Sequence, residues 1–214
     1  MTQLSSGLLE TVSLLLGWGY VTAWSVSFYP QLILNWRRQS VAGLSADFVW
    51  LNVAGFACYT LFTVGSLLLE HGGGSDGDGA VRFNDAVFAG HAFLVSSATA
   101  FQLWFYGSRR DRLQQLSRRT PTATTRLSRP ARITLTTIGL LLSTSAILLP
   151  TKTTLNLAAS VKVFVSLVKY TPQLLLNFQK KSTVGWSIGN ILLDATGGVL
   201  SFAQVAADSI IRGD

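Results

Sequence analysis

Charged residues are scarce in this sequence. Asp, Glu, Lys and Arg make up 13% of its 214 residues, about half the share of an average soluble domain. Apolar residues make up 49% of the chain, and the mean hydropathy is +0.39. The single cysteine, Cys58, excludes an intrachain disulfide. A soluble protein of this length needs more polar surface, so the composition points to a membrane protein.

Motifs for catalysis are also lacking. The sequence contains no metal-binding cluster, no nucleophile triad and no phosphate-binding loop. We therefore do not expect an enzyme, and we expect no metal and no bound cofactor.

Long intervals without charge are abundant instead, and they predict six membrane-spanning helices. Four intervals contain no charged residue, and two more contain only Lys162 and Lys169, or only Asp194. Each is close to or longer than the roughly 20 residues that a helix needs to cross a hydrocarbon core. The intervals are residues 11–34, 48–69, 86–108, 133–151, 153–179 and 182–207.

Basic residues alternate from loop to loop. Of the 17 Lys and Arg, 12 follow the first, third and fifth expected spans. The positive-inside bias therefore predicts that these loops are cytosolic and that the N-terminus is lumenal. The net charge of +7 follows from these loops and does not indicate nucleic-acid binding. We expect the basic loop 109–132 to be a solvated tether that also contacts anionic lipid of the bilayer.

One phrase occurs twice in the sequence. "FYPQLILNWRRQSVAGLS" at residues 28–45 matches "YTPQLLLNFQKKSTVGWS" at residues 170–187, 142 positions later and without a gap. A repeat of this size is a duplicated structural unit. Both copies have the same expected orientation, which is the plan of a parallel-repeat transporter with a binding site between its halves.

Each copy contains a Pro-Gln pair within its first apolar segment. A proline there removes a backbone donor and bends the helix. We interpret Pro30, Gln31, Pro172 and Gln173 as gating hinges. The alternative is that the prolines only kink the helices for packing.

Ionisable residues within the spans are candidates for substrate binding. An ionised side chain at mid-bilayer costs about 3 kcal/mol and usually faces a cavity. Lys162 and Lys169 share one helix face, and Asn190 shares the face of Asp194. Asn52 is the repeat equivalent of Asp194. These residues predict a cavity for an amino acid or a linked pair of amino acids. Alternatively, the lysines reach the two interfaces and Asp194 neutralises one of them.

Proton coupling has candidates of its own. Burial raises a carboxyl pKa and a nearby ammonium lowers it, so Asp194 can change protonation as the cavity opens. Asp85, at the lumenal start of the third span, is a second relay or an ordinary acid at a helix start. Trp24 and Phe28, one turn apart, wall the cavity or simply pack.

The two regions around these phrases resemble the PQ-loop regions of the cystinosin family of lysosomal cystine/proton symporters. The resemblance implies an all-α polytopic fold with two three-helix repeats joined by a linking helix. Residues 1–107 are then the first repeat, 108–152 the basic loop and linking helix, and 153–214 the incomplete second repeat. The resemblance implies substrate contacts at Trp24, Phe28, Asn52, Lys162, Lys169, Tyr170, Asn190 and Asp194.

The resemblance also implies a function and a location. Cystine is exported with protons from an acidic lumen, through a multi-pass protein of the lysosomal or vacuolar membrane. Proton coupling is implied at Asp194, with Asp85 as the second candidate. The family has a seventh helix, whereas this sequence ends in or just after the sixth expected span. We expect either a fragment or a reduced member whose second bundle another chain completes.

Three other functions are open. A sugar exporter of the same plan needs few charges, which argues against it. A cationic amino acid exporter is closer, although paired cavity lysines repel such a substrate. A receptor-like membrane protein that does not transport is the third alternative.

Overall fold

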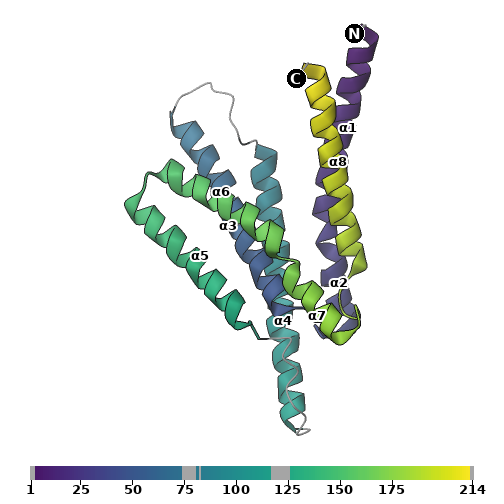
Figure 1. The fold of residues 1–214 in the computed structure, drawn as a ribbon, viewed down its shortest axis with the longest axis vertical. Coiled ribbons are helices and arrows are strands. Elements are labelled where there is room, and N and C mark those ends of the chain that lie inside the picture. The colour runs from purple at the N-terminus through teal and green to yellow at the C-terminus, as the bar shows by residue number, and fades with distance from the viewer. Residues whose placement is uncertain (1–2, 74–80, 82, 117–125, 213–214) are drawn as a thin grey trace. The chain divides into compact units, whose positions relative to one another are not determined.

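The protein is all-helical in the residues that the computed structural model describes, which are 3–73, 81, 83–116 and 126–212 (Figure 1). Eight helices, α1 to α8, occupy these ranges. They form two compact units: Met1–Gln31 with Ser187–Asp214 is unit 1, and Leu32–Trp186 is unit 2. The fold class expected from the sequence is confirmed.

Unit 1 is a pair of long helices. α1 (Gln3–Ser27) and α8 (Ile188–Arg212) pack along each other, and α8 runs back beside α1 so that its end lies near the beginning of α1 (Figure 1). The close approach depends on Gly17 and Gly19, where an added Cβ would lie 2.8 Å from the Gln204 side chain and 3.2 Å from Leu200. Small residues take this role in membranes because lipid removes the hydrophobic drive for helices to associate.

Unit 2 is centred on α3 (Ala46–Gly73). α4 (Phe83–Leu116) and α6 (Thr151–Val168) pack on α3, and α5 (Arg129–Leu148) packs on α6 and α3. α5 and α6 form a hairpin with a turn at Leu149 and Pro150. Two buried clusters on α3 hold the unit together, one around Leu44 and Phe48 and one around Leu51, Val161 and Val165.

The first and fifth predicted spans are broken helices. α1 ends at Ser27 and α2 (Tyr29–Arg38) follows after one residue; α6 ends at Val168 and α7 (Thr171–Lys180) follows after two. Pro30 and Pro172 lie at the second position of the second helix in each case. A proline is tolerated in a first helical turn because its missing N–H has no partner there. The six predicted segments therefore appear as eight helices.

The backbone repeats itself in the turns that follow α2 and α7. Gln39 and Lys181, which are equivalent, have φ of 48° and 49°. The equivalent glycines Gly43 and Gly185 have φ of 99° and 103°. Glycine populates this region at little cost, whereas other residues do so rarely. The duplicated phrase therefore encodes a duplicated backbone conformation.

Four helices have the length and apolar composition of a membrane span: Ala46–Leu69 in α3, Asp85–Ser108 in α4, Arg129–Leu148 in α5 and Ile188–Ile211 in α8. The two broken segments, which carry the other predicted spans, are not among them. Large apolar side chains face outward on these helices; Leu140 and Val199 are each 69% exposed. Apolar surface of this extent suits lipid contact.

The basic loop differs from the expectation of a solvated tether in its first part. α4 continues to Leu116, and α5 begins at Arg129 behind the N-cap Ser128. The stretch after Ser108 contains Arg, Gln and Leu, which are good helix formers. Residues 117–125 lie outside the described residues. The division of the chain at residues 107 and 152 follows the repeats and stays a prediction.

Candidate substrate site and hinges

The glutamine of each Pro-Gln pair bonds to the loop of the other repeat. In unit 2, Gln173 is fully buried; its Oε1 accepts a hydrogen bond from the Ser45 N–H at 2.8 Å, and its Nε2 donates to the Gly43 carbonyl at 2.9 Å. In unit 1, the Gln31 Oε1 accepts from the Ser187 N–H at 2.8 Å. Ser45 and Ser187 are equivalent, so the duplicated motif forms reciprocal bonds. The two glutamines lie in the first turns of α2 and α7. Each bond therefore connects one of these turns to a loop of the other repeat.

Lys162 of α6 and Lys169, the residue that follows the end of α6, lie against the same aromatic ring on α3. The Lys162 Nζ is 4.8 Å from the Phe56 ring centroid, and the Lys169 Nζ is 5.7 Å from it. Phe56 is 6% exposed and α3 approaches α6 closely at Gly55, where an added Cβ would lie 2.9 Å from Val165. The predicted shared face of the two lysines is thus oriented toward α3.

Amide and hydroxyl groups frame the two ammonium groups. The Lys169 Nζ donates to the Asn52 Oδ1 at 3.3 Å, and the Lys162 Nζ donates to the Ser166 Oγ at 2.6 Å. Asn52 in turn donates from its Nδ2 to the Ser96 Oγ of α4 at 2.9 Å. The Tyr170 ring lies 4.8 Å from the Lys169 Nζ. Unit 2 therefore brings together four predicted site residues: Asn52, Lys162, Lys169 and Tyr170.

Unit 1 brings together two others, Trp24 and Asp194. The Trp24 Nε1 donates to the Asp194 backbone carbonyl at 3.1 Å. Trp24 also meets the Tyr20 ring edge-on at 5.0 Å. A Cβ at Gly197 would overlap the Trp24 ring, so the glycine creates the space for it. Asn190 lies one turn before Asp194 on α8, and both side chains are half-buried.

The remaining predicted residues are located by their place in the helices. Phe28 lies at the break between α1 and α2, and Asp85 lies in the first turn of α4, as expected from the sequence. A single cavity lined by all eight residues stays a prediction.

Two aromatic residues of this site were missed by the sequence analysis. Phe56 lies close to both lysines, and Tyr59 has its ring 5.8 Å from the Lys162 Nζ. The sequence carries a signal for Phe56, because it follows Asn52 by four residues and therefore shares its helix face. A cation over an aromatic ring is a favourable contact that partly replaces hydration.

Comparison with known proteins places these features in a family. The family model of the PQ loop repeat matches residues 12–71 and 154–210. The chain is 37% identical over 211 residues to the protein named cystinosin of Drosophila melanogaster, covering 96% of this chain and 51% of that protein. It is 37% identical over 213 residues to the cystinosin homolog of Dictyostelium discoideum, covering 96% of this chain and 71% of the relative.

A third relative is named for its substrate. The cystine transporter of Saccharomyces cerevisiae is 30% identical over 204 residues, which cover 89% of this chain and 76% of the yeast protein. The chain thus spans about half the length of the fly relative and 71% to 76% of the other two. Relatives of this kind are transporters and not enzymes. The match of both repeats and the identity over nearly the whole chain show that this multi-pass membrane protein belongs to the cystinosin family of PQ-loop proteins.

Proposed function

We propose that the chain exports L-cystine together with protons from an acidic lumen to the cytosol by alternating access. The observation that carries this proposal is the pair Lys162 and Lys169, whose ammonium groups both lie within 6 Å of the centroid of one buried ring, at 4.8 and 5.7 Å. The names of the fly and yeast relatives support the choice of substrate. An acidic lumen points to the lysosomal or vacuolar membrane as the location.

The lysine pair matches the chemistry of cystine, which has two carboxylates and two ammonium groups. Each lysine is half-buried, so its ammonium attracts a carboxylate more strongly than an exposed lysine would. Lys169 is held by Asn52, and Lys162 by Ser166, so both charges are oriented before the substrate arrives. Preorganised groups bind more tightly because less side-chain freedom is lost on binding.

Asp194 is the proposed proton carrier, with Asp85 as a relay at the start of α4. Asp194 lies within the span Ile188–Ile211 of α8. The substrate amines need an acceptor, which a carboxylate provides when it is ionised. The same carboxylate releases the amines and takes up a proton, which links the flux of cystine to the flux of protons.

The broken helices are the proposed hinges. Pro30 and Pro172 lie in the first turn after each break, and Gln31 and Gln173 hold the second part of each helix to a loop of the other repeat. A segment that is interrupted at one point and anchored beyond it can change its angle without unfolding.

Cystine flux into or out of vesicles tests this proposal. Purified protein in liposomes that contain labelled cystine at acidic internal pH should export it, and the Lys162→Ala, Lys169→Ala double variant should lose at least about 30-fold in initial rate at low cystine. Loss of a buried charged partner commonly costs 2 to 5 kcal/mol, which corresponds to that factor or more. Asp194→Asn should remove the dependence on the pH gradient.

A matched control for the lysines is Lys152→Ala. Lys152 lies in the first turn of the same helix and is exposed, so its removal should leave the flux unchanged. Equal rates for the double variant and the wild type would overturn the role of the lysines. A gradient-dependent flux of lysine or arginine in place of cystine would favour the cationic amino acid exporter.

A further inference from the structure

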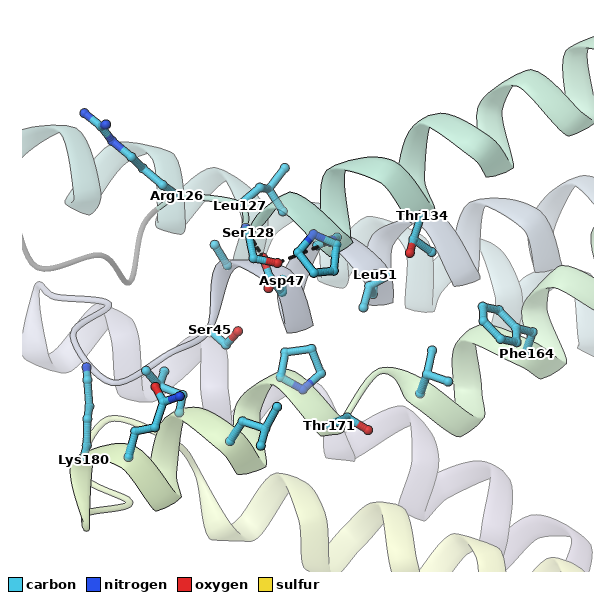
Figure 2. A pocket seen from close by; sticks show the side chains of 18 residues that line it. Ser45, Asp47, Leu51, Arg126, Leu127, Ser128, Thr134, Phe164, Thr171 and Lys180 are labelled. Atoms are coloured by element: carbon cyan, nitrogen blue, oxygen red, sulfur yellow. Dashed lines mark hydrogen bonds between the residues drawn. The ribbon is translucent and has the colours of Figure 1, made fainter.

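A second feature of unit 2 is a cavity that the transport proposal does not use. It measures about 1000 Å³ and lies between the N-terminal ends of α3 and α5, the end of α6 and the whole of α7. Figure 2 shows Arg126 and Lys180 at one end of it and Phe164 at the other. Between these ends the wall is mostly apolar and includes Leu51, Leu175 and Leu176.

The charges of the lining are unequal in number and in position. Arg126 and Lys180 are cationic, and Asp47 is the one acid among the described lining residues. The Asp47 Oδ1 accepts a hydrogen bond from the Ser128 N–H at 2.8 Å, a bond drawn in Figure 2. That bond holds the start of α5 against the start of α3. The excess of positive charge therefore lies at the end with Arg126 and Lys180.

We propose that this cavity binds an anionic phospholipid of the leaflet that faces the arginine-rich loop. The phosphate lies between Arg126 and Lys180, and one acyl chain follows the apolar wall toward Phe164. Charge complementarity selects this occupant, because a cationic end continuous with an apolar channel matches an anionic amphiphile. Basic groups between spanning helices on the cytosolic side bind such headgroups in general.

The place of the cationic end in the fold supports the same reading. Lys180 is the last residue of α7, and Arg126 lies just before α5, so both are at helix ends. Phe164 and Leu51 lie within α6 and α3, away from these ends. Pro172 also lines the cavity, so a bound chain would contact the break between α6 and α7.

Retention of phosphatidylserine by the purified full chain tests the proposal. The protein is exchanged into detergent with equal amounts of phosphatidylserine and phosphatidylcholine, and bound lipid is counted by native mass spectrometry. The wild type should retain phosphatidylserine preferentially. The Arg126→Gln, Lys180→Gln double variant should bind it about 10- to 30-fold more weakly, from about 1 kcal/mol for each basic residue.

Two further variants separate the charged and apolar parts. Thr134→Trp fills the middle of the cavity without a change of charge and should also reduce retention. The control Arg37→Gln, Lys181→Gln removes two exposed basic residues at the ends of α2 and α7 that do not line the cavity, and it should retain lipid as the wild type does.

Several results would overturn the proposal. Equal retention by all the variants would exclude the cavity as the lipid site. If soluble glycerophosphoserine displaced the bound lipid as effectively as phosphatidylserine does, the site would recognise the headgroup alone and would have no acyl channel. A photoreactive residue at position 134 that captures a second copy of the chain, and no lipid, would show an interface between copies.

Discussion

The helix pairs α1 with α8 and α6 with α3 are the same arrangement with the two repeats exchanged. In each pair, the first helix of one repeat packs on the second helix of the other. Both pairs have a close approach at equivalent glycines, Gly197 against Trp24 and Gly55 against Val165. The comparison teaches that both copies of the repeat kept a glycine at the helix contact, because a side chain at either position would separate the helices.

The side chains beside these glycines have diverged. Lys169 bonds to Asn52 in one pair. At the equivalent positions of the other pair stand Ser27, whose hydroxyl donates to the Trp24 carbonyl, and Asp194. The cation belongs to one pair and the acid to the other.

A second divergence lies about three turns further along α8, at Gln204. Ser13 of α1 bonds to Gln204 and Asp208: its hydroxyl donates to the Asp208 carboxylate, and its carbonyl accepts from the Gln204 Nε2 at 3.1 Å. The equivalents of Ser13 and Gln204 in the other pair are Leu155 and Phe62, which are apolar. One pair is thus held by hydrogen bonds at the level where the other is held by apolar packing.

The largest loss of stability is expected when a side chain is added at the glycines of the two loops, which tests whether their backbone conformation is shared. Gly43→Ala and Gly185→Ala should each lower the free energy of unfolding by about 3 kcal/mol, because each combines a positive φ with a Cβ that overlaps the carbonyl oxygen of Val184 or Ala42. Reversible unfolding in mixed micelles measures the change.

The comparison predicts similar losses for the two glycine variants, because the two loops have the same conformation. Gly139→Ala is the control, since a Cβ there has no atom within 4 Å. Within helix α5 this change should be neutral or stabilise the protein by up to about 1 kcal/mol. A large loss at Gly43 with none at Gly185 would break the equivalence.

A smaller effect is expected at the buried glutamine of unit 2. Gln173→Leu removes the bonds to Ser45, Gly43 and Asn177 and leaves a buried N–H without its partner. A buried group left unpaired costs about 1 to 3 kcal/mol, so we expect a loss of about 2 kcal/mol in the same unfolding measurement.

The control for this variant is Gln179→Leu, an exposed glutamine on the same helix, which should change stability little. Gln31→Leu should act in the same direction as Gln173→Leu because it removes the equivalent bond to Ser187. A stable Gln173→Leu variant would show that the reciprocal bonds do not hold the broken helices.

The smallest effect concerns the polar cluster of unit 1. Ser13→Ala removes the hydroxyl that donates to Asp208 and should cost about 1 kcal/mol, the usual net contribution of one hydrogen bond. The melting temperature in detergent measures it. Ser143→Ala, where an exposed hydroxyl donates to the Gly139 carbonyl of its own helix, should be silent. Equal shifts for both variants would mean that the cluster adds nothing to the pairing of α1 with α8.

Much of the fold could be predicted because its signals are local. Charge-free intervals predict the helical segments, and prolines predict where two of them break. The shared face of Lys162 and Lys169 follows from a spacing of seven residues. The bonds from Gln31 to Ser187 and from Gln173 to Ser45 could not be predicted, because they join a side chain to backbone amides 156 and 128 residues away. Any nearby polar side chain could satisfy such an amide, so no residue type identifies the partner.

The amino-acid sequence by itself determined that this is a membrane protein with a duplicated, proline-broken unit and ionisable groups within its spans, because composition and periodicity report directly on the solvent that each segment meets. Only the tertiary structure decided that α3 pairs with α6 and α8 with α1, and that both lysines lie close to the Phe56 ring. In lipid the apolar faces of all helices are nearly equivalent, so the choice of neighbour rests on close packing at glycines and on single hydrogen bonds.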